Sequence, residues 1–343
     1  MMKYAFALWL VLAGTAALAQ DILPDPAPAP MAEEEESDGR IVGGDPAPKG
    51  TVPWQAELFA AGKAEVQPAE LTADRELKPG SPNYKNKKFL DLRDKWEWHH
   101  RCGGAIIPTP PGQSGIWVLT AAHCVTVLES NPLNWRRVRL GTQDLKSGGK
   151  TYAIDRVAIH SGYGASRAHD IALVRMGGTL PATAKPIRLL HDRPNDRPLT
   201  PRNRLFVTGW GLTAISTAGA TLRARDGSLL RESPVLMQVE LQAFPDNQCG
   251  AFDSYRAAIA SGGALCAGSP TEGKDACPGD SGGPVTRVQG TAPVLVGLVS
   301  LGIGCGQKDV PGVYVKVSEY RAWIDKAMRE AEPGKAKRIA PPG

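Results

Sequence analysis

Residues 115–124 of the chain read Gly-Ile-Trp-Val-Leu-Thr-Ala-Ala-His-Cys. The run from Ile116 to Thr120 is apolar, rich in β-branched side chains and preceded by a glycine, which is typical of a short strand. His123 follows that run directly, so a histidine is placed at a strand end. Similar runs, bounded by Gly, Pro, Asn or Asp, recur at residues 137–140, 205–210, 235–241, 294–301 and 312–317. The repeated pattern predicts an all-β protein, either a sandwich or a pair of barrels.

Three segments depart from this pattern. Residues 318–330 have apolar side chains at helical spacing after a serine that could cap a helix, so we expect a C-terminal helix there. Residues 60–99 and 212–233 are polar and are expected to be surface insertions within a β-domain at residues 41–332. Residues 333–343 are rich in Lys and Pro, which predicts a disordered tail.

The N-terminal 40 residues have the composition of processed segments. Residues 1–19 run from a basic start through an apolar stretch to Ala17-Leu18-Ala19, which predicts a signal peptide cleaved after Ala19. An uncleaved membrane anchor is disfavoured, because the apolar stretch is shorter than the roughly 20 residues that span a bilayer. Residues 20–40 are rich in Pro, Ala and Glu and too polar to fold alone, so we interpret them as an acidic activation pro-segment.

The overall composition, 42% hydrophobic and 22% charged, is that of a globular protein, and the net charge is +5. The body is basic, since the N-terminal region is acidic. Its Lys and Arg residues are scattered and no nucleic-acid-binding motif accompanies them, so nucleic acid is excluded as a partner. An exported protein would pair its six cysteines. Six cysteines allow 15 pairings, and spacing alone does not choose among them.

The stretch Gly279-Asp280-Ser281-Gly282-Gly283-Pro284 carries the most specific chemistry. Glycines beside a serine can leave its hydroxyl exposed and aim backbone N–H groups at a substrate carbonyl oxygen. A serine hydroxyl is a weak nucleophile that needs a base, and a carboxylate must fix the tautomer of that base. His123 and Asp170, each next to an apolar run, are the candidates for these two roles.

Residues 120–124, 170–173 and 279–284, in that order, resemble the three catalytic segments of the chymotrypsin/trypsin family of serine proteases. The chain order His, Asp, Ser separates this family from other serine hydrolases that reach the same geometry. The similarity runs from about Ile41 to Trp323, interrupted by the two insertions. It implies two six-stranded antiparallel β-barrels, chymotrypsin-like, with a C-terminal helix.

The resemblance also implies a role for each motif residue. Ser281 would be the nucleophile, His123 the general base and acid, and Asp170 the orienting carboxylate. The backbone N–H groups of Gly279 and Ser281 would form the oxyanion hole, which binds the negative oxygen of the intermediate. The family's disulfide pairing would be Cys102–Cys124, Cys249–Cys266 and Cys277–Cys305.

Substrate specificity would depend on Asp275. In trypsin-like members an aspartate six residues before the nucleophile lies at the base of the primary (S1) pocket. A buried carboxylate there pairs with a cation, so cleavage after Arg or Lys follows. Ser300, Gly302 and Gly312 match positions that line this pocket, and the two glycines leave room for a long basic side chain.

The resemblance further implies a zymogen. Arg40-Ile41-Val42-Gly43-Gly44 matches the family's cleavage junction. After cleavage the new amino group of Ile41 would fold inward and pair with Asp280, which would assemble the pocket and the oxyanion hole. Because Arg40 itself matches a trypsin-like cleavage site, the enzyme could process its own precursor.

The chain departs from the family at two substrate-facing positions. Leu301 stands where trypsin-like members usually have an aromatic residue, and Pro278 replaces a flexible polar residue at the rim of the pocket. Extended subsite preference therefore stays open. Residues 142–149 carry one carboxylate, too few for the calcium site of some relatives, so no metal is expected.

The insertion at residues 60–99 ends in an aromatic and histidine-rich stretch with Trp96, His99 and His100. We interpret it as a solvated loop that covers the barrel. The alternatives are an exosite for an acidic partner or a metal site, for which adjacent histidines without further ligands are weak evidence.

The sequence thus predicts a secreted serine endopeptidase, extracellular or periplasmic and monomeric, that needs no cofactor. Its expected partners are protein or peptide substrates with Arg or Lys at the cleaved position, and proteinaceous inhibitors. The main alternative is a catalytically inactive homologue that acts as a binding protein, although no triad residue is missing. A serine esterase on another fold is a second alternative, but it would leave the Arg40 junction and the cysteine layout without a role.

Overall fold

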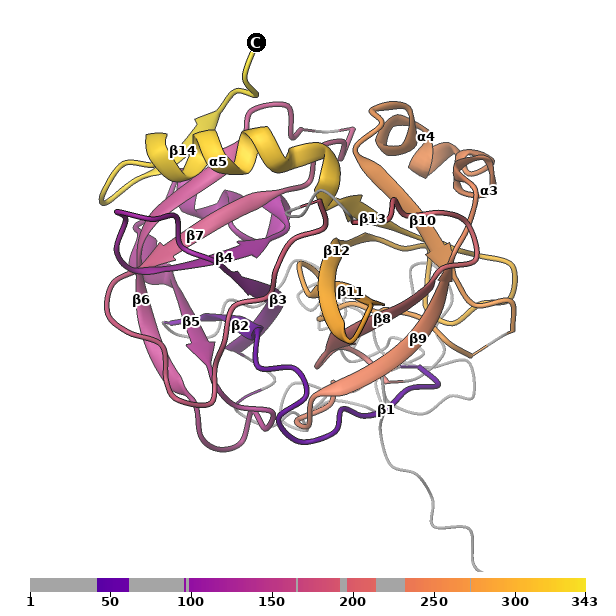
Figure 1. Cartoon of the computed structure of the whole chain (residues 1–343), viewed down its shortest axis with the longest axis horizontal. Helices are drawn as coiled ribbons and strands as arrows, with labels where there is room; N and C mark the ends of the chain where they lie inside the picture. The colour runs from indigo at the N-terminus through magenta and orange to yellow at the C-terminus, as the bar shows by residue number, and fades with distance from the viewer. Residues whose placement is uncertain are drawn as a thin grey trace, which may run out of the picture. The chain divides into compact units, whose positions relative to one another are not determined.

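The strand-like runs of the sequence form two sheets, and each sheet closes into a barrel (Figure 1). The computed structural model describes residues 42–61, 96, 99–164, 166–191, 196–213, 232–271 and 273–343, all within the unit of residues 38–343. The predicted signal peptide, the predicted pro-segment and most of both insertions lie outside the described residues.

The first barrel has the strand order β6-β5-β2-β3-β4-β7 and closes because β6 also pairs with β7. Strand β4 is the run at residues 116–120, and all of its side chains are buried. Every pairing in the barrel is antiparallel. The strands are β2 (Gln55–Ala60), β3 (His100–Ile107), β4 (Ile116–Thr120), β5 (Arg136–Leu140), β6 (Lys150–His160) and β7 (Ala172–Met176).

The second barrel has the strand order β8-β9-β10-β13-β12-β11 and closes through the pairing of β11 with β8. A short strand outside the barrel, β1 (Asp45–Pro46), pairs with β9. The predicted all-β fold of two six-stranded antiparallel barrels is therefore confirmed. The strands are β8 (Arg204–Gly209), β9 (Met237–Ala243), β10 (Ala264–Gly268), β11 (Pro284–Gln289), β12 (Ala292–Leu301) and β13 (Gly312–Lys316).

The C-terminal tail is ordered, contrary to the prediction for residues 333–343. Its strand β14 (Ala336–Ile339) pairs in parallel with β6, and Ile339 is buried. The indole Nε1 of Trp323 donates a hydrogen bond to the Ile339 carbonyl (2.9 Å). Arg338 binds both carboxylate oxygens of Glu129, at 2.7 and 2.9 Å. The local sequence did not reveal this strand, because its residues are mostly polar and its partner, β6, lies far earlier in the chain.

One helix was predicted, and the α-helices whose whole length is described are α3 (Asp246–Gly250), α4 (Asp253–Ala260) and α5 (Arg321–Glu330). The predicted C-terminal helix is α5, preceded by the 3-10 turn η6 (Val317–Tyr320). The helix therefore begins after Tyr320, and Ser318 does not cap it. Its buried face carries Trp323 and Ile324, which belong to the core cluster of the first barrel. Helices α3 and α4 are too short for the 3.6-residue period to reveal them.

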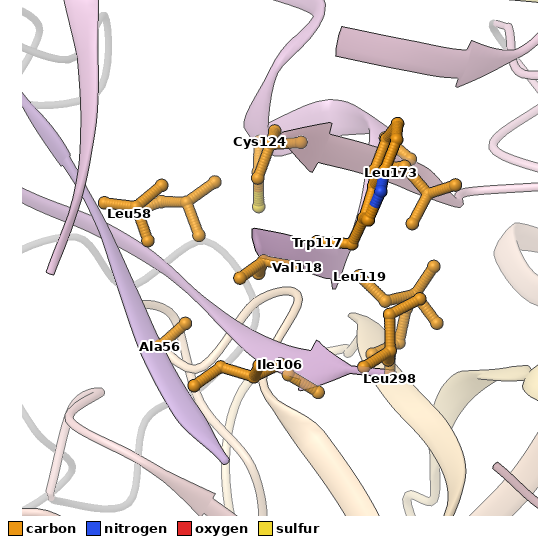
Figure 2. Packing of buried hydrophobic residues seen from close by; sticks show 14 of the residues in the cluster. Ala56, Leu58, Ile106, Trp117, Val118, Leu119, Cys124, Leu173 and Leu298 are labelled. Carbon is orange, nitrogen blue, oxygen red and sulfur yellow. The ribbon is translucent and has the colours of Figure 1, made fainter. Parts of the chain in front are cut away.

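The cores of the barrels meet along the side of β4 and β12. Figure 2 shows the packing of Trp117 and Leu119 from β4 with neighbouring side chains, and Leu298 of β12 belongs to the same buried cluster. Polar contacts also cross between the barrels: the hydroxyl of Thr208 donates a hydrogen bond to the side-chain oxygen of Gln55 (2.7 Å). The junction of the barrels is thus fixed by apolar packing and by buried hydrogen bonds.

Two of the three predicted disulfides are present. Cys102–Cys124 connects β3 to the 3-10 turn η3 (Ala122–Cys124), and Cys249–Cys266 connects α3 to β10. The third pairing is not formed in the structure. Cys277 and Cys305 are buried thiols, and their side chains lie within hydrogen-bonding reach of each other.

Candidate active site

The loops between the strands bring His123 and Asp170 together. His123 lies in η3, directly after β4, and Asp170 lies just before β7, the strand that pairs with β4. The ring Nδ1 of His123 is 2.8 Å from Asp170 Oδ2, and the backbone N–H of His123 donates to Asp170 Oδ1 at 2.9 Å. The ring and its main chain are therefore held by one carboxylate, which fixes the ring orientation.

Asp170 is buried and fully paired. The hydroxyl of Ser300, on β12 of the second barrel, donates a 2.6 Å hydrogen bond to Asp170 Oδ2. Burial opposes ionisation of Asp170, but the interaction with His123 and the hydrogen bonds from His123 and Ser300 outweigh it, and the pKa stays below its ordinary value. The carboxylate is therefore charged at neutral pH and can stabilise a positive charge on His123.

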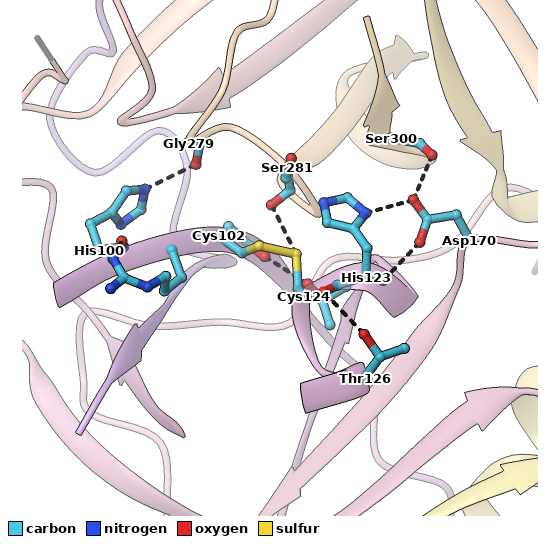
Figure 3. The surroundings of a disulfide bond; sticks show 12 residues. His100, Cys102, His123, Cys124, Thr126, Asp170, Gly279, Ser281 and Ser300 are labelled. Atoms are coloured by element: carbon cyan, nitrogen blue, oxygen red, sulfur yellow. Dashed lines mark hydrogen bonds and ion pairs between the residues drawn. A yellow bond between two sulfur atoms is a disulfide. The ribbon is translucent and has the colours of Figure 1, made fainter. Parts of the chain in front are cut away.

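Ser281 lies on the other side of the His123 ring from Asp170 (Figure 3). Its carbonyl oxygen accepts a hydrogen bond from the backbone N–H of Gly103 (2.7 Å), and Cys124 Sγ is 3.7 Å from the same oxygen. Among the described residues the hydroxyl of Ser281 makes no hydrogen bond, so it is free to attack a bound group. Hydrogen bonds between a nucleophile and its base are often long before substrate binds.

The backbone at Gly279 leaves one N–H group without a partner. The Pro278 carbonyl accepts a hydrogen bond from the backbone N–H of Leu212 (2.9 Å). Because the peptide is trans, the N–H of Gly279 points the opposite way, and it has no acceptor within the described part of the chain. Gly279 has φ +97°, and a Cβ there would lie 2.8 Å from Gly211 Cα. Only glycine fits this position.

The N–H of Ser281 is unpaired in the same way. The carbonyl before it, that of Asp280, accepts a hydrogen bond from the Gly283 N–H (2.8 Å), and the described residues supply no acceptor for Ser281. The N–H groups of Gly279 and Ser281 are thus two free donors beside the serine hydroxyl. Such a pair can bind the oxygen of a carbonyl that becomes negatively charged during attack.

A pocket of about 300 Å3 opens next to Ser281, and it contains the residues predicted for the specificity pocket. Strand β12 and the loop after it contribute one wall, and the start of β13 contributes another. The two departures from the family pattern, Pro278 and Leu301, also line it. The predicted pocket residues among its lining are Asp275, Ser300, Gly302 and Gly312.

Gly302 leaves the pocket open without being required by the backbone. A Cβ there would meet only the Gly304 carbonyl oxygen, at 3.5 Å, which is ordinary contact, and Gly302 does not have a positive φ. The backbone would therefore tolerate a side chain at residue 302, and the absence of one leaves the pocket wider at this wall.

Asp275 is a buried carboxylate in the pocket lining. Its two oxygens accept hydrogen bonds from the backbone N–H groups of Ala276 (2.8 Å) and Gly306 (3.1 Å). Burial raises the pKa of Asp275 to about 7, and nearby Asp280 adds to this effect against the hydrogen bonds. A cation in the pocket would restore full ionisation.

Asp280 is a second buried carboxylate, and its hydrogen-bond partners among the described residues are backbone N–H groups. It accepts hydrogen bonds from the backbone N–H groups of Gly211 (2.8 Å) and Cys277 (2.9 Å). Burial nevertheless raises its pKa to about 6. Its predicted partner Ile41, and Arg40 before it, lie outside the described residues.

The residue after Ile41 is described. Val42 is buried, its carbonyl accepts a hydrogen bond from the Asp275 N–H (3.2 Å), and its side chain packs where a Cβ of Gly306 would lie. The segment that follows the predicted cleavage junction is therefore anchored beside the base of the pocket.

Residues at the end of the first insertion are less exposed than expected. His100 is buried at the start of β3, so the interpretation of a solvated loop is wrong for this residue. His99 and Trp96 are partly buried and line a cleft of about 530 Å3 together with Phe59 and Arg139. Residues 62–95, 97 and 98 lie outside the described part.

The two cysteine sulfurs beside His123 are bonded to each other and are therefore not thiolate ligands for a metal. Among the described residues, the His, Cys, Asp and Glu side chains that come close enough together to share an ion are Cys102, His123 and Cys124, and the two cysteines form a disulfide. None of the described helices is long and apolar enough to cross a membrane.

Sequence reasoning missed two roles at this site. Ser300 was expected only as a pocket residue, yet it also binds Asp170. Glu57 and His100 form a buried pair behind the Gly279 loop that no sequence motif indicated. Both contacts join residues far apart in the chain, so no local pattern could have shown them.

Comparison with known proteins agrees with this arrangement. A family profile described as Trypsin matches residues 79–324. The chain is also 32% identical over 234 residues to the clotting factor G beta subunit of Tachypleus tridentatus. The matched region covers 65% of this chain and 69% of that protein.

Proposed function

Since the chain belongs to the trypsin family of serine proteases, we propose that it is a secreted endopeptidase, activated from a zymogen, that cleaves after Arg or Lys. One observation carries this proposal: a buried carboxylate, Asp275, lies in a pocket that opens beside Ser281 and its free N–H donors. A substrate held there by a basic side chain would present the next carbonyl group to the nucleophile.

The proposed mechanism uses His123 and Asp170 as they stand in the structure. Ser281 Oγ attacks the carbonyl carbon while its proton passes to His123 Nε2, and Asp170, bonded to Nδ1, stabilises the imidazolium. The oxygen of the tetrahedral intermediate becomes negative and binds the N–H groups of Gly279 and Ser281, each worth roughly 3–4 kcal/mol. His123 then protonates the leaving amine, and an acyl-enzyme remains. Water next attacks the acyl carbon while its proton passes to His123, and His123 returns that proton to Ser281 Oγ as the carboxylic acid leaves.

The specificity proposal follows from charge. Asp275 is ionised only in part in the empty pocket, because burial raises its pKa to about 7. An Arg or Lys side chain would pair with it and restore the charge, whereas an apolar side chain would leave the carboxylate without a partner. Gly302 and Gly312 leave the width that a long side chain needs.

The activation proposal follows from Asp280. Its carboxylate is buried with a raised pKa, so a cation placed beside it would be strongly favoured. Cleavage after Arg40 would free the amino group of Ile41, and the neighbouring Val42 is already anchored next to Asp275. The new ion pair would then stabilise the loop that carries Gly279 and Ser281.

The localisation proposal rests on the predicted signal peptide at residues 1–19 and on the two disulfides, which form in oxidising compartments. The similar clotting factor subunit is in keeping with an extracellular protease.

A comparison of cleaved and uncleavable protein tests the proposal. Protein cleaved after Arg40 should hydrolyse an Arg or Lys amide substrate and should be inactivated by a fluorophosphonate that labels Ser281. The Arg40→Gln precursor should show neither property under the same treatment, and cleaved Ser281→Ala should lose nearly all turnover. Normal turnover by Ser281→Ala would contradict the mechanism, and a cleaved protein that is inert to substrate and reagent would favour the inactive-homologue alternative.

A further inference from the structure

His100, at the start of β3, is a buried histidine that the proposed mechanism does not use. Its Nε2 is 2.9 Å from the Gly279 carbonyl oxygen (Figure 3), and its Nδ1 is 3.3 Å from Glu57 Oε1 on β2. Only 2% of its surface is exposed. His100 therefore links the first barrel directly to the loop that carries the oxyanion-hole donors.

The two contacts of His100 require a charged ring. A carboxylate oxygen and a carbonyl oxygen are both acceptors, and a neutral imidazole carries only one N–H. Both contacts are hydrogen bonds only when both ring nitrogens are protonated. Glu57 is itself held from behind, because Arg139 Nε on β5 lies 2.9 Å from Glu57 Oε2.

The charges around His100 favour this cation. Burial alone would lower the pKa of His100, but Glu57, Glu232 and the Gly279 carbonyl outweigh it and raise the pKa to about 9. Negative groups thus face the ring from several elements. The nearby cations bind other atoms: Arg139 binds Glu57, and Arg101 binds the His100 carbonyl. The charged and titratable groups near the ring are Glu57 on β2, Glu232 before β9, Asp280 before β11, Arg139 on β5 behind Glu57, and Arg101 on β3, whose guanidinium donates to the His100 carbonyl.

The bond to Gly279 bears on the oxyanion hole because the N–H and the carbonyl of that residue lie in two adjacent peptide planes joined at its Cα, so the torsions of Gly279 set one plane relative to the other. A glycine at φ +97° has few steric limits on its torsions, so hydrogen bonds must hold it in place. The bond between Leu212 and the Pro278 carbonyl holds the peptide on one side, and the bond from His100 holds the carbonyl on the other.

We propose that His100, kept as a cation by Glu57, is a positioning residue that fixes the Gly279 carbonyl and thereby aims the Gly279 N–H into the oxyanion hole. The inference rests on the proposed function. When His100 loses its proton, the neutral ring keeps one N–H, and because the Glu57 carboxylate is a stronger acceptor than a carbonyl, that N–H stays at Nδ1 and the hydrogen bond to the Gly279 carbonyl is lost. The hole then loses the alignment of one donor, while Asp275 and the pocket keep theirs.

The affinities of two ligands for enzyme cleaved after Arg40 report separately on the oxyanion hole and on the pocket. With an arginine peptide aldehyde, Ser281 Oγ forms a bond to the aldehyde carbon, its proton passes to His123, and the oxygen becomes the oxyanion. Benzamidine pairs with Asp275 and does not reach the hole. As the pH rises from 8 to 10, we expect the aldehyde to bind about tenfold more weakly, as for one lost hydrogen bond, and the affinity for benzamidine to stay constant.

Variants identify the group that titrates. Glu57→Gln should shift the midpoint of the aldehyde profile to lower pH, because His100 loses the carboxylate that favours its cation. His100→Gln, whose amide can donate but does not titrate, should keep most of the affinity and abolish the pH dependence. His100→Leu should bind the aldehyde about tenfold more weakly at every pH. Glu240→Gln, which removes an exposed partner of Arg204 on the second barrel, is the matched control and should leave both profiles unchanged.

Three results would overturn the proposal, and the last of them would overturn the proposed function as well. If both ligands lose affinity together above pH 8, the titrating group is one that assembles the whole site, such as the Ile41 amino group. If His100→Gln keeps the wild-type profile, His100 does not position the hole, and this conclusion holds even if Glu57→Gln fails to fold. If neither ligand binds at any pH, the proposed function fails, and with it this inference.

Discussion

The carboxylates of the two barrels differ in their charge partners. In the first barrel, Asp170 has His123 beside it and a hydrogen bond from Ser300, and its pKa lies below the ordinary value. In the second barrel, the direct hydrogen-bond donors to Asp275 and Asp280 within the described part of the chain are backbone N–H groups, and burial raises their pKa values to about 7 and about 6, for Asp280 against the positive charge of nearby His100.

We call the half of the site in the first barrel complete, because its carboxylate, Asp170, has a side-chain partner that can carry a positive charge. We call the half in the second barrel incomplete, because Asp275 and Asp280 have no such partner in direct contact among the described residues. In the first barrel, Asp170 already has its hydrogen bonds from His123 and Ser300. In the function proposed above, the carboxylates of the second barrel receive their cations from outside the folded body: Asp275 from the substrate and Asp280 from a new N-terminus. Catalysis would then be controlled in the second barrel, and the first barrel would stay the same before and after activation.

The largest loss of activity is expected from a substitution at Asp170, in the complete half of the site. Asp170→Asn should lower kcat by about 10⁴-fold, because an amide can hold the wrong tautomer of His123 and cannot stabilise the imidazolium. Steady-state kinetics on an arginine amide substrate measure this loss. Benzamidine should bind the variant as it binds wild type, because benzamidine pairs with Asp275 and the amide oxygen of the variant can still accept the hydrogen bond from Ser300. A loss of benzamidine affinity would show that the two halves are not independent.

The next largest loss of activity is expected from a substitution at Asp275, in the incomplete half of the site. Asp275→Asn should lower kcat/KM for an arginine substrate by about 10³-fold, which corresponds to the roughly 4 kcal/mol lost when one partner of a buried ion pair is removed. The rate on a substrate with leucine at the cleaved position should not fall, because that substrate has no charge to pair. The ratio of the two kcat/KM values is the measurement, and an unchanged ratio would exclude Asp275 as the specificity residue.

A smaller effect should appear when the pH alone is changed. Asp275 is ionised above its pKa of about 7 and protonated below it, so benzamidine should bind tightly at pH 8 and about a hundredfold more weakly at pH 5. Calorimetry on the cleaved enzyme measures this profile. Asp275→Asn should bind weakly throughout and show no such rise. A flat wild-type profile would mean that the carboxylate is already ionised in the empty pocket.

The smallest effect is expected at the outer edge of the first barrel. Truncation after Glu332 removes β14, with the buried Ile339 and the Arg338–Glu129 pair, and should lower the free energy of unfolding by about 1–2 kcal/mol. Turnover should stay within twofold. Truncation after Ile339, which removes only the last four residues, is the control and should change neither quantity. Equal unfolding free energies for the two truncations would show that β14 adds no stability.

The sequence was informative where a local pattern dictates a local structure. Strand β4 and its histidine could be predicted because an apolar run bounded by glycine must be buried and must end at a loop. The pocket residues could be predicted because the family resemblance gives their spacing from Ser281, and the structure brings Asp275, Ser300, Gly302 and Gly312 to one pocket.

What the sequence could not show depends on partners distant in the chain. Strand β14 becomes a strand only because β6 offers it an edge, although its own composition is polar. His100 is buried as a cation only because Glu57 and the Gly279 carbonyl meet it from two other elements. Residue spacing cannot indicate whether the thiols of Cys277 and Cys305, which do meet, are bonded.

Ser300 has a consequence for anyone who would redesign this protein. Its hydroxyl donates a hydrogen bond to Asp170 in one barrel, and the same residue lines the pocket that is proposed to select the substrate in the other. A substitution that reshapes this wall for a new side chain would also loosen the carboxylate behind the base. Under the proposed function, selectivity and speed would therefore be coupled at this position, and variants with altered preference should be sought first at Gly302, where an added Cβ would meet only the Gly304 carbonyl oxygen, at 3.5 Å.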